Sequence, residues 1–205
     1  MAKGSAFERE ICRKLTDWWN GKPDPDGDTR FWRTAGSGGR VTSRARKGKK
    51  STVAHCGDIA GLDDDAALLT KYVALELKRG YREATLHHLL DKPHKAAEQT
   101  YEAWIKQAAD SMHAAGAAHW AIIHRRDRRE ILVTVPRAIV DCVFDYPTLP
   151  LYGIGPGYQW MHVWVAVGDS VYETITCRLD AFLGRASPDR IRELSRAHAA
   201  RPKSS

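Results

Sequence analysis

The chain has 205 residues, which suits one domain with some additions, and its 43% hydrophobic content is enough to build a core. No run of about 18 apolar residues occurs, so we expect no membrane-spanning helix. The formal net charge of +7 favours a polyanionic partner such as nucleic acid, although charge alone does not separate binding from catalysis.

The cysteines and the start of the chain indicate a compartment. The four cysteines are widely separated and form no C-x-x-C pair, so we expect free thiols in a reducing environment rather than a disulfide framework or a zinc site. The first residues lead directly into a charged helical pattern, without a secretory signal. We therefore expect a cytoplasmic protein.

The first predicted element is an amphipathic helix over residues 3–19. Apolar residues recur at helical spacing from Phe7 to Trp19. Ser5 fits the N-cap position, and Glu8, three residues later, would complete a capping box. The pattern thus gives Glu8 a structural role at the start of the helix.

A turn-rich loop leads from this helix to a short strand predicted over residues 30–35. The glycine-rich segment 36–39 follows, and its backbone amides, with the Ser37 hydroxyl, can approach a phosphate closely. Residues 40–51 then form a basic arm that we expect to bind the phosphates of DNA. The alternative is a solvated loop. The basic residues of the arm are Arg40, Arg44, Arg46, Lys47, Lys49 and Lys50.

Two short strands, over residues 53–60 and 72–78, are predicted to form a hairpin through the turn formers between them. Side chains alternate along a strand, so Glu76 and Lys78 share one face, and the hairpin would bring Asp58 beside Glu76. Two close carboxylates repel each other until a cation sits between them. Mg²⁺ prefers oxygen ligands, which these two carboxylates can supply together with the backbone carbonyl of Leu77. The Lys78 ammonium can then orient a water or offset charge in the transition state.

The strongest helix prediction covers residues 94–115 and ends at Gly116. Gln107 lies near its apolar stripe and is either a site residue or a surface residue. Strands predicted over 118–124 and 130–135 follow, joined by a turn with four arginines that is a second candidate phosphate contact or a solvent-facing turn. Strands at 158–167 and 171–175 and a basic helix from Pro188 to Ala200 complete the prediction.

Three segments, in order, resemble a known group of nucleases. Asp58 followed by Glu76-x-Lys78 resembles the signature of the PD-(D/E)xK nuclease superfamily. Lys3-Gly4-x-x-x-Glu8-Arg9-Glu10-Ile11 and Arg33-Thr34-Ala35-Gly36-Ser37-Gly38-Gly39 resemble the opening helix and the following Gly-Ser segment of archaeal-type Holliday junction resolvases within it. The basic arm and the region after residue 135 are departures from the small archaeal pattern.

The resemblance implies an α/β, restriction-endonuclease-like fold, with a mixed central sheet flanked by helices. It also implies an endonuclease that uses Mg²⁺, or Mn²⁺ in its place, to cut branched DNA, above all four-way junctions, as a homodimer. In this reading Asp58, Glu76, the Leu77 carbonyl and Glu8 serve the metal, and Lys78 acts in catalysis. The remaining DNA-binding candidates are Arg9, Arg33 and Gln107.

Two alternatives stay open on the sequence alone. One is a PD-(D/E)xK nuclease with another substrate, such as a restriction or nicking endonuclease, and the other is a DNA-binding protein without catalysis. For the domain organisation we expect a single nuclease domain over residues 1–185, with a core at 3–135 and strand additions at 136–185. Residues 186–205 are expected to form a basic C-terminal helix and tail.

Overall fold

The computed structural model describes residues 3–23, 29–34, 57–80, 89, 101–144 and 160–201. Most of the predicted phosphate-binding residues fall outside these ranges, namely Ser37, Arg40, Arg44, Arg46, Lys47, Lys49 and Lys50. The elements, in order, are α1 (Lys3–Asn20), β1 (Phe31–Arg33), β2 (Ile59–Gly61), α3 (Asp64–Tyr72), β3 (Val73–Arg79), α4 (Tyr101–Ala115), β4 (His119–Arg125), β5 (Leu132–Pro136), α5 (Arg137–Val143), β6 (Trp160–Val167), β7 (Ser170–Arg178), α6 (Leu179–Leu183) and α7 (Pro188–Ala199).

A five-stranded sheet with the order β3-β4-β5-β7-β6 forms the centre of the fold. The first pair, β3 and β4, is parallel, and the other pairs are antiparallel. A separate two-stranded ribbon, β1 with β2, lies beside the β3 edge, where the Asp58 N–H donates to the Leu75 carbonyl at 2.7 Å. This mixed sheet flanked by helices confirms the predicted α/β, restriction-endonuclease-like class.

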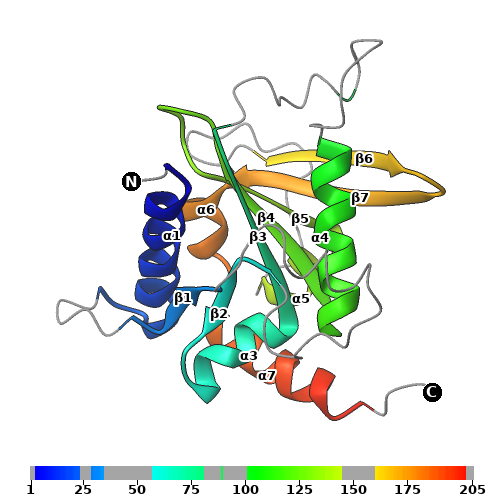
Figure 1. Cartoon of the computed structure of the whole chain (residues 1–205). Helices are drawn as coiled ribbons and strands as arrows, with labels where there is room; N and C mark the ends of the chain where they lie inside the picture. Colours follow the sequence, from blue (N-terminus) through cyan, green and yellow to red (C-terminus); the bar gives the residue numbers. More distant parts are fainter. Residues whose placement is uncertain are drawn as a thin grey trace, which may run out of the picture.

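The helices α1 and α4 pack on opposite faces of the sheet (Figure 1). The alternation of side chains along β4 supplies both contacts, because Ala121 and Ile123 join the core cluster of α1 while Trp120 and Ile122 join that of α4. The helix α4 ends as predicted at Gly116, whose φ of +65° is the left-handed conformation typical of a glycine after a helix. Strand β3 therefore lies between two packed helices.

Two local predictions are wrong. The segment before β3 is not a hairpin turn, because Asp63 caps a helix there, its Oδ1 accepting from the Ala66 N–H at 2.8 Å, and α3 fills the connection. Ser5 is not an N-cap either, since α1 already begins at Lys3, and this rules out the capping-box role for Glu8. None of the helices in the described ranges combines the length and apolarity that crossing a membrane requires.

The last helix, α7, is fastened to elements from the first third of the chain. The Arg192 guanidinium donates to both carboxylate oxygens of Asp65, at 2.9 and 3.1 Å, and lies 4.2 Å from the centre of the Trp19 ring. The Trp19 indole N–H donates to the same Asp65 at 2.8 Å, and the Ser195 hydroxyl donates to the Leu68 carbonyl. The contacts join α7 to both α1 and α3.

Candidate active site

Two residues, Gly57 and Thr34, hold the backbone of Asp58 against β3. Gly57 has a φ of +101°, and a Cβ on it would lie 2.8 Å from the Leu75 carbonyl oxygen, so only glycine allows this close approach. On the other side, the Thr34 N–H donates to the Asp58 carbonyl at 3.0 Å, and its hydroxyl donates to the Gly57 carbonyl at 2.9 Å. These contacts fix the Asp58 carboxylate at the β3 edge.

The Asp58 side chain completes this attachment, because its Oδ2 accepts from the Leu77 N–H at 2.7 Å. A strand residue directs its N–H and C=O to the same side. The Leu77 carbonyl therefore faces the side of the strand on which Asp58 lies, as does the Leu75 carbonyl. This is the arrangement that the predicted use of the Leu77 oxygen requires.

Glu76 is buried, with 3% of its surface exposed, and faces α4. Its Oε1 accepts from the Ser111 hydroxyl at 2.7 Å, and its Oε2 accepts from the Gln107 amide at 2.8 Å. These two donors are four residues apart on α4 and so share one helix face. The helix thus fixes both oxygens of a carboxylate that the strand presents.

Lys78 lies beside Glu76 on the same face of β3, as the alternation predicts. It is also buried, at 8% exposed, and its Nζ donates to the Gln107 Oε1 at 2.7 Å and lies 3.5 Å from the Glu76 Oε2. Gln107 therefore bridges the acid and the amine, using its oxygen for one and its nitrogen for the other. The structure brings Gln107 to Glu76 and Lys78 rather than to the helix surface.

The surroundings of Asp58 disfavour its charged form. Burial raises the pKa of Asp58 to about 7, and the Glu76 carboxylate adds to the increase, with a smaller contribution from Glu8. The Leu77 N–H and the Lys78 ammonium act in the opposite direction and do not compensate. Asp58 and Glu76 are two buried acids with a single ammonium group, that of Lys78, beside them. A cation bound between them would therefore be stabilised.

Glu8 is near this pair but is not joined to it by a hydrogen bond. The Arg33 guanidinium lies 3.5 Å from the Glu8 carboxylate, and Arg33 itself is largely exposed at the end of β1. Arg9, next along α1, is half-buried. Arg33 therefore lies beside Glu8, where β1 approaches α1.

The three predicted acids do not close into a ligand cluster. Within the parts of the chain that the structure describes, no group of three or more His, Cys, Asp or Glu side chains is placed to hold a metal ion. Asp58 and Glu76 nevertheless fit a hard divalent cation, because they are oxygen donors with unbalanced charge and a backbone carbonyl on the same side. Glu8 belongs to the surroundings of this pair.

Three contributors were missed from the sequence. Ser111 could have been found, because it lies one helical turn beyond Gln107. Gly57 and Thr34 carried no signal, because their roles depend on how closely β1, β2 and β3 approach one another.

Comparison with known proteins gives one match. A family model described as "Phage putative PDDEXK endonuclease" matches residues 1–193. No curated protein and no solved structure matches the chain.

Proposed function

Because the chain belongs to this family of phage PDDEXK endonucleases, we propose that it hydrolyses DNA phosphodiesters at the β3 edge with Mg²⁺, or Mn²⁺ in its place. The observation that supports this most is that Gln107 of α4 holds both Glu76 and Lys78, while the Asp58 carboxylate is held by the N–H of Leu77 between them. No site of this kind is needed for binding DNA alone, since backbone phosphates are bound from the surface.

Each residue then has a defined task. Asp58, Glu76 and the Leu77 carbonyl would hold the ion, with Glu8 assisting from the side. A divalent ion supplies polarisation of the phosphate and a lowered pKa of bound water. Lys78, held by Gln107, donates to the attacking water or to the oxygen on which charge develops. Arg33, exposed beside Glu8, and Arg9, which follows Glu8 on α1, each contact a phosphate.

We further propose branched DNA, above all four-way junctions, as the substrate and a homodimer as the active form. Support comes from the resemblance of the Glu8 helix and of the Arg33–Gly39 segment to junction resolvases. A homodimer would place two such sites on opposed strands of one junction. The competing substrate is linear duplex, as for a restriction or nicking endonuclease of the same superfamily.

The test uses a labelled four-way junction and a linear duplex of the same sequence, at equal salt, with and without Mg²⁺, analysed on a denaturing gel. We expect Mg²⁺-dependent nicks near the branch point and little cleavage of the duplex. Equal cleavage of both DNAs would replace the junction proposal with a duplex nuclease.

Asp58→Ala separates the enzyme from a binding protein. It should abolish cleavage while leaving DNA affinity intact, and a parent protein that cuts neither DNA with Mg²⁺ or Mn²⁺ would contradict catalysis. Sedimentation of the protein, with and without a junction, measures its oligomeric state and so tests the dimer.

A further inference from the structure

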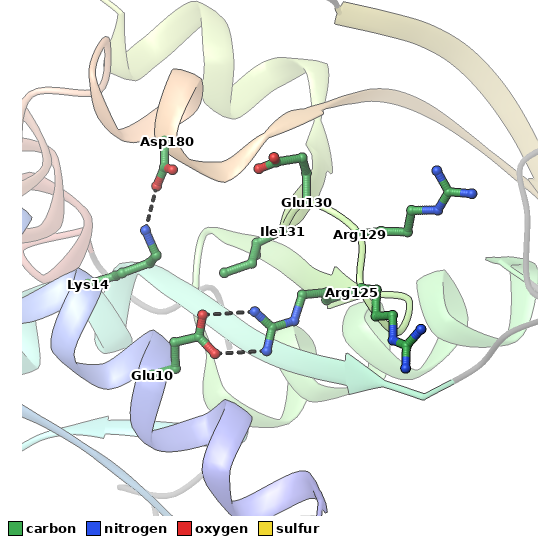
Figure 2. Close-up of a pocket in the computed structure, with 8 residues that line it drawn as sticks. Glu10, Lys14, Arg125, Arg129, Glu130, Ile131 and Asp180 are labelled. Carbon is green, nitrogen blue, oxygen red and sulfur yellow. Dashed lines mark hydrogen bonds and ion pairs between the residues drawn. The ribbon is translucent and has the colours of Figure 1, made fainter.

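A second basic feature lies outside this site, in a cavity of about 470 Å³ (Figure 2). The turn between β4 and β5 forms one wall, and α1 and α6 contribute the other side chains. Its lining residues are Glu10, Lys14, Arg125, Arg128, Arg129, Glu130, Ile131 and Asp180. The proposed chemistry at Asp58 and Glu76 uses none of them.

Two of the four basic side chains are already neutralised. Arg125 donates through both terminal nitrogens to the two Glu10 oxygens, each at 2.8 Å, and Lys14 donates to Asp180 at 2.9 Å. The side chains of Arg128 and Arg129 have no hydrogen-bond or ion-pair partner among the residues that the structure describes, and Figure 2 shows the Arg129 side chain pointing away from both ion pairs. The basic side chains of the cavity without partners therefore come from the turn between β4 and β5.

The turn that presents these arginines is strained. The Arg129 N–H donates to the Arg126 carbonyl at 3.1 Å, which closes a four-residue turn, and Arg128, at its third position, has a φ of +59°. Turns with a positive φ at this position favour glycine or asparagine. An arginine here costs conformational energy, and strain of this kind points to a functional role for the side chain.

The turn is also rigidly placed relative to the proposed active site. The Arg125 guanidinium, held by Glu10, lies 5.0 Å from the centre of the Phe7 ring on α1, the helix that carries Glu8. In the parallel pair, Lys78 is opposite His124, so the turn begins just beyond the level of Lys78. At about 3.3 Å per residue along a strand, the two free arginines lie roughly 10 Å farther on.

We propose that Arg128 and Arg129 form a phosphate subsite for the DNA strand that is cut. The turn lies beyond Lys78 along β4, so the phosphate bound here is a neighbour of the cleaved bond and not the cleaved phosphate itself. The subsite rests on the proposed function for its substrate, while its existence as a DNA contact can be measured without cleavage.

The experiment compares Arg128→Gln/Arg129→Gln with a matched control, Arg196→Gln/Arg201→Gln. Both pairs remove two positive charges. The control arginines lie on α7 and just after it, and α7 contacts Gly116, which precedes β4. They are therefore at the end of β4 that is opposite to the turn. Duplex affinity is measured without metal ion by fluorescence anisotropy over a range of salt concentrations. The slope of log K against log salt should fall by about 0.9 for each phosphate that the variant no longer neutralises.

We expect a slope smaller by about 1 to 2 for the turn variant, with an affinity at least tenfold weaker, and an unchanged slope for the control. Equal slopes in the two variants would overturn the subsite. Because the readout is binding, a protein that cuts no DNA would refute the proposed function and still test this contact.

A single substitution provides an independent check. Arg128→Gly relieves the positive φ, so the melting temperature should rise while DNA affinity falls. A rise in melting temperature with full DNA affinity would contradict a phosphate contact at Arg128.

Discussion

Gly57→Ala tests whether the close approach of two backbones builds the active site. The new Cβ would lie 2.8 Å from the Leu75 carbonyl oxygen and 3.1 Å from the Leu75 nitrogen, on a backbone whose φ is +101°. The conformational cost is about 1–2 kcal/mol, and forcing the two segments apart costs about 1–3 kcal/mol more. We therefore expect the free energy of unfolding to fall by about 2–5 kcal/mol, the sum of these two costs.

Gly80→Ala is the matched control for this substitution. Gly80 has a similar φ of +88°, and a Cβ there would meet nothing within 4 Å, so it carries the conformational cost without the collision. Urea unfolding, followed by tryptophan fluorescence, gives the two free energies at equal pH and salt.

Cleavage rate is the second readout for the pair. Displacing Asp58 from the Leu77 N–H by even about 1 Å should lower the rate by about 10²-fold, whereas Gly80→Ala should cut DNA normally. If the two variants are equally stable and equally active, then the approach of Gly57 to β3 does not position Asp58.

The remaining predictions concern separate contacts. Asp65→Ala should cost about 2 kcal/mol in urea unfolding, because it removes hydrogen bonds to charged and indole donors, while Asp110→Ala, in an exposed ion pair, should cost under about 0.5 kcal/mol. Burial lowers the pKa of His124 to about 4, so the unfolded chain takes up the proton first as pH falls. Stability that is complete above about pH 6.5 should then decline by about 2 kcal/mol by pH 5, and His124→Gln should remove this part of the pH dependence. Ser111→Ala leaves one oxygen of the buried Glu76 carboxylate without its donor, so it should lower the free energy of unfolding by about 1–3 kcal/mol and reduce kcat/KM at limiting Mg²⁺ by about tenfold; an unaltered rate would exclude a positioning role.

Periodicity made much of the fold predictable. The strand pair of β4 and β5, the hairpin of β6 and β7 and the helix α7 follow from alternation or from helical spacing. The two short helices α5 and α6 are 7 and 5 residues long, too short for a periodic signal. The helix α3 was missed because its three opening aspartates resemble a turn, although the first of them is a regular N-cap.

The site divides in the same way. Alternation alone placed Glu76 and Lys78 on one face of β3, because that relation is local. Asp58 was predicted to reach Glu76 through a hairpin. Glu76 does raise the pKa of Asp58, but α3 intervenes between the two segments and β2 pairs with β1 instead. Contacts between distant segments, such as that of Thr34 with Gly57, depend on the tertiary fold, so local sequence patterns do not predict them.

The attachment of α7 to Trp19 and Asp65 has a consequence for biosynthesis. Arg192 is synthesised 173 residues after Trp19, so α1 lacks this contact while all of the intervening chain is being made. Products that terminate before residue 188 would leave Leu69 and its neighbours on α3 uncovered, which makes such fragments ready targets for proteolysis.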